Sequence, residues 1–233
     1  MALLEVKDLQ AGYHKKSVLQ NVSLRVEPGE FVGVIGHNGA GKTTMVRSIF
    51  GLIQPTGGSI HFGDQSIVGN QPAENVQEGM AMVPQDRAVF PNLSVRDNLE
   101  LAAFYVRDKA HVAHRIGEIE HLFPILKERQ KQLAGTMSGG QQRMLSIGIA
   151  LMQNPRLLML DEPSLGLAPL LVQNMMEQVR NINQMGTAVL LIEQNVASAL
   201  AAASRMYVMK LGQMVYDGPP EKLQDRGFLM ELF

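Results

Sequence analysis

Residues 31–43 read FVGVIGHNGAGKT, a short apolar run that passes directly into a glycine-rich loop. The segment from Gly36 to Thr43 matches the pattern G-x-x-x-x-G-K-[ST] of a phosphate-binding loop. Glycines let backbone N–H groups approach phosphate oxygens, and a following helix adds unpaired N–H groups and its positive dipole end. The stretch therefore predicts a strand over Phe31 to Ile35, a phosphate-binding turn and a helix that begins near Lys42.

The residues of this loop are candidates for nucleotide contacts. Lys42 is expected to reach the outer phosphates, and the Thr43 hydroxyl is expected to hold Mg²⁺. The candidates form one continuous run, namely Gly36, His37, Asn38, Gly39, Ala40, Gly41, Lys42, Thr43 and Thr44. A nucleotide with Mg²⁺ is therefore the expected ligand.

A second apolar run ends in two carboxylates. Leu157 to Leu160 is uninterrupted, as in a strand buried on both faces, and Asp161 and Glu162 follow it directly. Ligands of parallel sheets bind at the carboxyl edge, so this strand delivers both carboxylates to the edge of the phosphate loop. We expect Asp161 to hold a Mg²⁺-bound water and Glu162 to act as general base on the attacking water.

Composition excludes several other classes of function. The chain has 233 residues, 45% hydrophobic and 18% charged, as in a globular protein of one large domain or two small ones. Its net charge of −1 argues against a generally basic nucleic-acid-binding protein, and no guanine-reading Asn-Lys-x-Asp sequence occurs. The absence of cysteine excludes disulfides and cysteine-ligated zinc. We expect neither a secretory leader nor a membrane-spanning segment.

Strands and helices alternate along the chain. Strands are expected at 3–6, 22–26, 31–35, 59–62, 80–83, 157–160, 187–192, 205–210 and 213–216, and helices at about 141–152 and 170–183. A charged, largely helical stretch spans 95–128. This order predicts an α/β fold with a mostly parallel core sheet, an N-terminal antiparallel β part and an inserted α-helical part.

Residues 137–142, MSGGQQ, resemble the signature sequence of ABC ATPases, usually LSGGQ, with Met137 in place of the leucine. The turn stands at an expected helix start, where a serine hydroxyl and glycine N–H groups can grip an anion. In this family two subunits pair head to tail, and the signature of one closes on ATP held by the other. The resemblance assigns that contact to Ser138, Gly139, Gly140 and Gln141.

The resemblance covers essentially the whole chain and implies a P-loop NTPase fold of the ABC type. It implies a single ATP-binding cassette over 1–233. Within it, a nucleotide-binding core occupies 1–86 and 154–233, and a helical subdomain that carries the signature occupies 87–153. The ligands that it implies are ATP and Mg²⁺.

The family pattern also assigns roles to single residues. It implies that Tyr13 stacks on adenine. It implies that Gln85 touches Mg²⁺, together with Thr43 and Asp161, and joins the core to the helical subdomain.

Two positions depart from the common pattern. Ala168 stands where the loop after Glu162 usually has an aspartate, and Gln194 stands where a histidine is expected after the strand at 187–192. An amide can hydrogen-bond to a γ-phosphate but cannot carry the positive charge available to histidine. Gln194 is therefore expected beside Glu162 as a catalytic residue. A mainly regulatory subunit that relies on a partner's stronger site remains an alternative.

The sequences EPSLGLAP at 162–169 and IEQN at 192–195 resemble the smaller ATP-binding subunit of branched-chain amino-acid importers. RAVFP at 87–91 fits that group, and Phe90 and Pro91 could line a groove for a permease helix. The implied partners are a second ATP-binding subunit, two membrane permeases and, indirectly, a periplasmic or lipoprotein solute-binding protein, with no nucleic acid. The implied location is the cytoplasmic face of the membrane.

Two other functions remain open. The first is the same role for urea or short-chain amides, whose importers share the pattern at 87–91. The second is a soluble ABC ATPase that acts on ribosomes, DNA or iron–sulfur assembly. Length and charge favour transport, because DNA-repair members are much larger and translation factors carry two cassettes in one chain.

Overall fold

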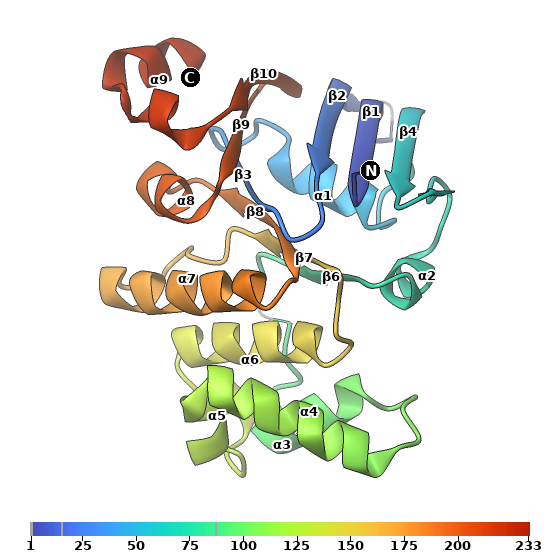
Figure 1. Ribbon diagram of the computed structural model, residues 1–233, viewed down its shortest axis with the longest axis vertical. Coiled ribbons are helices and arrows are strands. Elements are labelled where there is room, and N and C mark those ends of the chain that lie inside the picture. Colours follow the sequence, from blue (N-terminus) through green and yellow to red (C-terminus); the bar gives the residue numbers. More distant parts are fainter. Residues whose placement is uncertain (1, 15, 87) are drawn as a thin grey trace.

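The computed structural model describes residues 2–14, 16–86 and 88–233. Arg87, the first residue of the expected helical subdomain, lies outside the described residues. Two sheets with helices around them make up the fold, and the two sheets lie near each other toward one end of the long axis (Figure 1).

A six-stranded core sheet has the order β10-β9-β3-β8-β7-β6. Neighbouring strands are parallel except β9 and β10, which form an antiparallel hairpin. The strands are β3 (Phe31–Ile35), β6 (Met80–Val83), β7 (Leu157–Asp161), β8 (Ala188–Glu193), β9 (Arg205–Lys210) and β10 (Gln213–Gly218). The mostly parallel core sheet predicted from the sequence is therefore confirmed.

The central strands are buried on both faces, so successive side chains enter two different hydrophobic cores. In β7, Leu158 and Leu160 pack in the core that includes α6, whereas Leu157 and Met159 pack in the core shared with the antiparallel sheet. Each large apolar side chain contributes about 1.5–3 kcal/mol when it leaves water. Burial on two faces explains why this strand reads as an uninterrupted apolar run.

A four-stranded antiparallel sheet has the order β2-β1-β4-β5. Its strands are β1 (Leu4–Tyr13), β2 (Lys16–Val26), β4 (Gly57–Phe62) and β5 (Gln65–Ser66). The strands expected at 3–6 and 22–26 have the right place but are too short. Register shifts between β1 and β2 break the apolar alternation from which strand length is predicted.

Helix α1 (Lys42–Ile49) begins directly after the glycine-rich loop. Gly41 has a φ of 109°, a conformation that residues with a Cβ rarely adopt. A Cβ at Gly36 would lie 2.2 Å from the backbone oxygen of Met209, so a larger residue would clash there. The helix stops just before Gly51, whose φ of 87° suits a helix end, as predicted.

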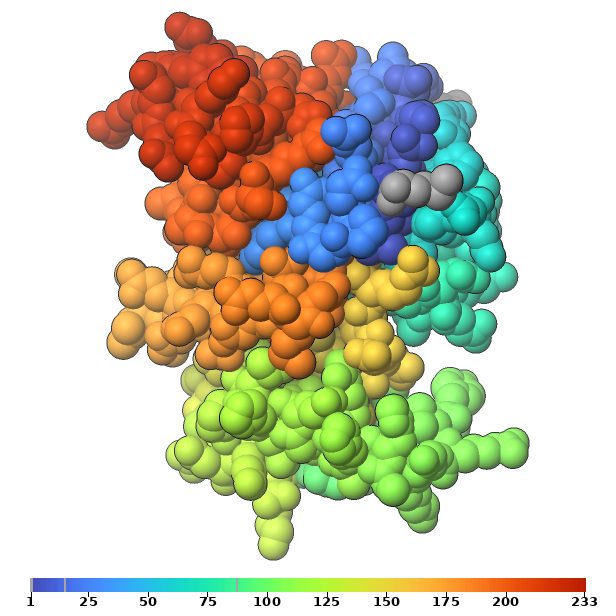
Figure 2. Space-filling model, in the orientation of Figure 1, coloured from blue at the N-terminus to red at the C-terminus, as the bar shows by residue number. Residues whose placement is uncertain are grey.

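Helices α3 to α6 gather at one end of the long axis, as the ribbon and the space-filling view both show (Figure 1, Figure 2). They are α3 (Val95–Ala102), α4 (Lys109–Leu122), α5 (Pro124–Glu128) and α6 (Gly139–Leu151), with the 3-10 turn η1 (Ala134–Thr136) before α6. The helical stretch expected at 95–128 is thus three helices, because Asp108 caps a new start and Pro124 opens another. The division at residues 87 and 153 stays a prediction.

The remaining helices flank the core sheet. They are α2 (Pro72–Gln77), α7 (Pro169–Gln184), α8 (Val196–Ala202), the 3-10 turn η2 (Pro220–Gln224) and α9 (Arg226–Leu232). Helix α7 matches the expected helix at 170–183, whereas α2, α8 and α9 are too short to show a helical period. In the described part of the chain, no helix combines the length and apolar character needed to cross a membrane.

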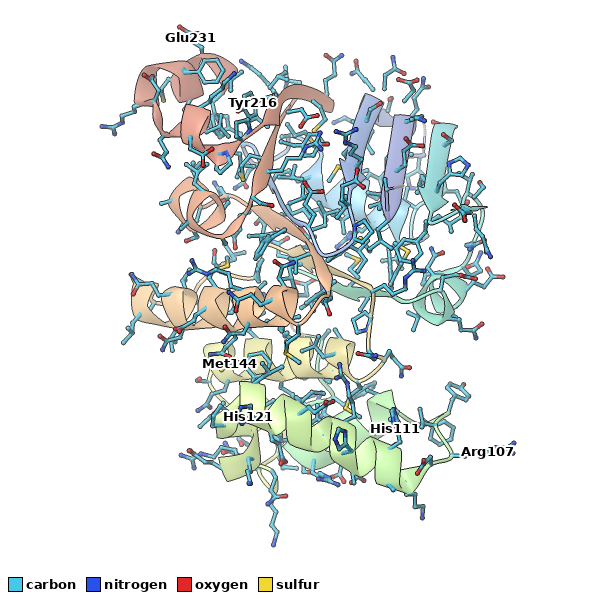
Figure 3. The ribbon with its side chains drawn as sticks, viewed as in Figure 1. Arg107, His111, His121, Met144, Tyr216 and Glu231 are labelled. Carbon is cyan, nitrogen blue, oxygen red and sulfur yellow. The ribbon has the colours of Figure 1, made fainter. Side chains whose placement is uncertain are left out.

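The C-terminal segment returns to the phosphate loop. Tyr216 of β10 packs edge-on against Phe228 of α9, with ring centres 5.8 Å apart, beside the last helix in Figure 3. Phe233 follows α9, and its ring meets that of His37 edge-on with ring centres 4.6 Å apart. Since His37 belongs to the phosphate loop, residues far apart in the sequence contact each other here.

Candidate functional site

Three neighbouring strands of the core sheet end at one edge and carry the candidate residues. Strand β8 lies between β3 and β7, and all three are parallel. Ile35 pairs with Glu193, and Ile192 pairs with Asp161. The phosphate loop, Gln194 and Glu162 directly follow these paired positions, so the sheet brings them together.

A cavity of about 450 Å³ opens at this edge. It is lined by Val18, Asn38, Gly39, Ala40, Gly41, Lys42, Thr43, Thr44, Gln85, Glu162, Leu165 and Gln194. All of these except Val18 and Leu165 are among the candidates predicted from the sequence. Residues from five separate parts of the chain therefore line one cavity.

The Lys42 ammonium is buried among oxygen atoms. Its Nζ donates to the backbone oxygens of Gly36 at 2.7 Å and His37 at 3.2 Å. The same nitrogen lies 3.3 Å from the Glu162 carboxylate. Lys42 is 4% exposed and Glu162 is 7% exposed, so water and salt screen this ion pair little. The cation of the phosphate loop therefore contacts the base candidate directly.

Thr43 and Asp161 form the next contact, in which the Thr43 hydroxyl donates to Asp161 Oδ1 at 3.1 Å. The other carboxylate oxygen, Oδ2, is buried without a hydrogen-bond partner among the described residues. Burial raises the pKa of the Asp161 carboxyl, the Thr43 hydrogen bond lowers it, and the nearby charge of Glu162 raises it again. A partnerless buried carboxylate oxygen beside a threonine hydroxyl fits Mg²⁺, which takes oxygen ligands.

Glu162 lines the cavity and has an unusual backbone conformation. Its φ of 47° lies in the left-handed region, which non-glycine residues seldom adopt and which recurs at functional turns. Its N–H donates to the Ile192 oxygen at 2.9 Å, and Gln85 Nε2 donates to Glu162 Oε2 at 3.2 Å. Both hydrogen bonds hold the carboxylate beside the cavity.

The end of β8 carries a buried carboxylate whose role no sequence pattern indicates. Glu193 Oε1 accepts a hydrogen bond from the Ser164 N–H at 3.0 Å. Oε2 accepts from the Ser164 hydroxyl at 2.8 Å and from the Asn195 N–H at 3.4 Å. Burial raises the pKa of Glu193, and these hydrogen bonds act in the opposite direction. Glu193 thereby joins the loop after Glu162 to the loop of Gln194.

The signature turn caps helix α6 and does not line this cavity. The Ser138 hydroxyl accepts from the Gln141 N–H at 3.4 Å, and Gln141 Oε1 accepts from the Ser138 N–H at 3.0 Å, which is a capping box. None of the residues 138–141, all of them described, is among those that line the 450 Å³ cavity. The turn and the phosphate loop are therefore separate places on one chain.

Arg143 connects the helix of the signature turn to the segment of Gln85. Its guanidinium donates to the Pro84 oxygen at 2.7 Å and to the Gln85 oxygen at 2.6 Å. Because the Gln85 side chain reaches Glu162, hydrogen bonds lead from α6 to the base candidate. Sequence reasoning missed Arg143, since its partners are backbone atoms 58 and 59 residues away.

Tyr13 lies at the end of β1, where it pairs with Lys16 and is 44% exposed. It is not among the residues that line the cavity, whereas Val18 of β2 is. The adenine-stacking role of Tyr13 stays a prediction. Sequence reasoning did not predict the two cavity residues Val18 and Leu165. Val18 is an aliphatic residue in a strand and so resembles any core position. The exposure of Leu165 is visible only in the structure.

A family model described as ABC transporter matches residues 19–165, which include the phosphate loop, the signature turn and both carboxylates. The chain belongs to the ABC transporter family. It is an ABC transporter ATPase, and membership of this family implies that the chain binds ATP. The family predicted from the signature turn and the α/β fold predicted with it are both confirmed.

Known relatives of this ABC transporter ATPase cover nearly its whole length. It is 42% identical to the high-affinity branched-chain amino acid transport ATP-binding protein BraG of Pseudomonas aeruginosa, over 91% of each chain. It is 33% identical to the lipopolysaccharide export system ATP-binding protein LptB of Escherichia coli, over 97% of this chain and 94% of that one. A solved ATP-binding cassette of an ABC transporter superposes with a TM-score of 0.90 at 26% identity, over 100% of this chain and 98% of that one.

Proposed function

We propose that this chain hydrolyses ATP to drive the import of branched-chain amino acids. The proposal is supported by Lys42, Thr43 and Glu162, which line one cavity. Asp161 is buried next to them and accepts a hydrogen bond from Thr43. The choice of solute is supported by BraG and by a 34% identical relative, the probable branched-chain amino acid transport ATP-binding protein LivF of Archaeoglobus fulgidus. LivF matches over 95% of this chain and 94% of its own.

The phosphate loop and Lys42 bind the phosphates of ATP. Backbone N–H groups of the loop donate to phosphate oxygens, and Lys42 gives its charge to the outer phosphates. To do so, its Nζ exchanges the contact with Glu162 for a phosphate oxygen. Glu162 then loses its cation partner at the moment when a proton acceptor is needed beside the γ-phosphate.

Glu162 acts as the general base. As the water oxygen bonds to the γ-phosphorus, the Glu162 carboxylate accepts the water proton and the bond to the β–γ bridging oxygen breaks, giving ADP and phosphate. The amide of Gln194 donates to the γ-phosphate from the opposite loop of the cavity wall. The Gln85 hydrogen bond keeps the Glu162 carboxylate in place.

Thr43, Asp161 and Gln85 form the donor set for Mg²⁺. The fit rests on the buried, partnerless Oδ2 of Asp161 and on the adjacent Thr43 hydroxyl. Gln85 donates through Nε2 to Glu162, which leaves its amide oxygen for a cation. When bound, Mg²⁺ neutralises charge on the β- and γ-phosphates.

The chain works as part of a transporter complex at the cytoplasmic face of the membrane. A second ATP-binding subunit, paired head to tail, supplies its residues 138–141 to the ATP held here. This is supported by Ser138, which is exposed and lies outside its own chain's cavity. The complex includes two permeases, and the helical subdomain at 87–153 receives a permease helix in a groove with Phe90, whose side chain is exposed. A solute-binding protein delivers the amino acid on the other side.

The test is transport by the purified complex of this chain with the second ATP-binding subunit and the permeases in liposomes. We expect uptake of labelled leucine when ATP and the loaded solute-binding protein are both supplied, and no uptake when this chain carries Glu162→Gln. ATP binding should survive that change. Uptake of urea without uptake of leucine would contradict the choice of solute. Co-purification with ribosomes in place of membrane proteins would contradict the transport role.

A further inference from the structure

Glu193 differs from the other buried charged groups at the sheet edge because the proposed mechanism gives it no task. It is 1% exposed at the end of β8. Its carboxylate accepts two hydrogen bonds from Ser164, which lies 29 residues away along the chain, and one from the Asn195 N–H. A carboxylate that only completed its own strand end would not need a partner so distant in the sequence.

We propose that Glu193 is a positioning residue, which locks the loop of Glu162 to the loop of Gln194 so that the base and the γ-phosphate contact keep one relative geometry. The inference rests on the proposed function, in which Glu162 is the base and Gln194 donates to the γ-phosphate. Glu193 acts through Ser164 and Asn195 and does not itself touch the substrate.

The geometry of Ser164 supports this role. Both its N–H and its hydroxyl donate to Glu193, so backbone and side chain are held at once. Ser164 stands two residues after Glu162, whose φ of 47° is a conformation that persists only where the surroundings hold it. The Glu162 N–H is itself bonded to the Ile192 oxygen. The end of β8 thus holds the turn of the base at two points.

The surrounding space explains why such a lock matters. A second cavity of about 280 Å³ lies between the same two loops, and Ser164 and Glu193 are among its lining residues. Glu162 and Gln194 line this cavity and the nucleotide cavity alike. Empty space beside both residues leaves room for the loops to shift, and any such shift changes the nucleotide cavity directly.

The test compares two variants of the lock with a matched control in the full chain. Glu193→Gln keeps the side-chain shape but weakens the acceptor, and Ser164→Ala removes the hydroxyl donor. The control is Ser146→Ala, because Ser146 is also buried and its hydroxyl donates one hydrogen bond, to the Gln142 oxygen at 2.9 Å within α6. Four quantities are measured in each: kcat, the Kd for ATP, the melting temperature and amide hydrogen exchange.

We expect Glu193→Gln to lower kcat about tenfold, because a hydrogen bond to a charged group is worth about that factor. The Kd for ATP should change less than about twofold, since Lys42 and the phosphate loop are untouched. Amide exchange over 162–168 and over 194–195 should accelerate together, while β8 stays protected. Ser164→Ala should also lower kcat. The double variant should have a kcat no lower than that of Glu193→Gln, because both substitutions disrupt the same interaction between Glu193 and Ser164. Ser146→Ala should lower only the melting temperature.

A kcat in both variants equal to that of the control, or faster exchange in one loop alone, overturns the role of Glu193. If Glu193→Gln does not fold, Ser164→Ala carries the test. Glu162→Gln is measured alongside to separate the two proposals. Turnover that survives in Glu162→Gln removes the proposed base, whereas turnover lost there and normal in Glu193→Gln overturns the positioning role alone.

Discussion

The phosphate-loop edge and the signature turn are both helix starts, but they differ in what they leave for a ligand. At the edge, Lys42 contacts Glu162 and Thr43 contacts Asp161, so each charged group has a partner that the proposed mechanism also uses. At the turn, Ser138 and Gln141 satisfy each other in a capping box. The edge is a set of coupled charges, whereas the turn is a locally complete helix start.

This contrast indicates which functions a single chain can perform without a second subunit. A change at the edge alters a network within the same chain, so it should affect ATP handling directly. A change at the turn leaves that network intact, so its effect on ATP turnover should appear only where a second subunit meets the turn.

The strongest test of the edge is Glu162→Gln. We expect turnover to fall about a thousandfold, within the range of a lost general base. ATP affinity should stay the same or rise, because a neutral side chain no longer competes for Lys42. Phosphate release and equilibrium ATP binding measure the two effects separately. Turnover near the wild-type rate would show that the edge does not supply the base.

Lys42→Ala should weaken ATP binding itself, by about a hundredfold or about 2.7 kcal/mol. The change removes the phosphate contact and also leaves the buried Glu162 carboxylate without its cation. Titration with ATP measures the loss. Lys127→Ala in α5 is the control, since Lys127 is exposed and remote from the cavity lining. Equal Kd values in the two variants would show that Lys42 contributes no more to ATP binding than a surface lysine does.

Ser138→Ala tests the turn and has a matched partner in Ser94→Ala. Both serines cap helices in capping boxes, so each change should cost about 1 kcal/mol of stability, or about 2–4 °C in melting temperature. Only Ser138→Ala should also lower turnover of the paired subunits, with the ATP affinity of the single chain unchanged. Equal turnover in the two variants would show that the turn is a helix start and nothing more.

The smallest effect is a gain in stability from Asp161→Asn, which removes a buried charge whose Oδ2 has no hydrogen-bond partner in the described part of the chain. We expect about 1 kcal/mol, seen as a higher melting temperature. Burial raises the folded-state pKa of Asp161, so its ionised form costs stability only once the pH rises above the usual carboxyl range. The gain should be present at about pH 8 and fade toward about pH 4. An equal gain at both values would contradict the charge explanation.

Much of the phosphate-loop edge could be predicted because each of its parts lies within a short stretch of sequence. Strands β6 and β9 match their expected bounds residue for residue. The phosphate loop, Asp161 and Glu162 follow apolar runs directly, and parallel pairing then brings them to one edge. Local pattern and tertiary structure agree at these positions.

The parts that escaped prediction depend on contacts between distant segments. Glu193 accepts hydrogen bonds from Ser164 of another strand end, and Arg143 donates to the backbone oxygens of Pro84 and Gln85, far away along the chain. The full length of β1 was missed because register shifts disturb its alternation. Such pairings are set by how the sheets pack, and no window of sequence contains both partners.

The ring contact between Phe233 and His37 identifies a position for a fluorescent probe of ATP binding. The chain contains no tryptophan, so ATP binding has no indole fluorescence to report it. Phe233→Trp would introduce a single tryptophan beside the phosphate loop without changing any residue that lines the cavity.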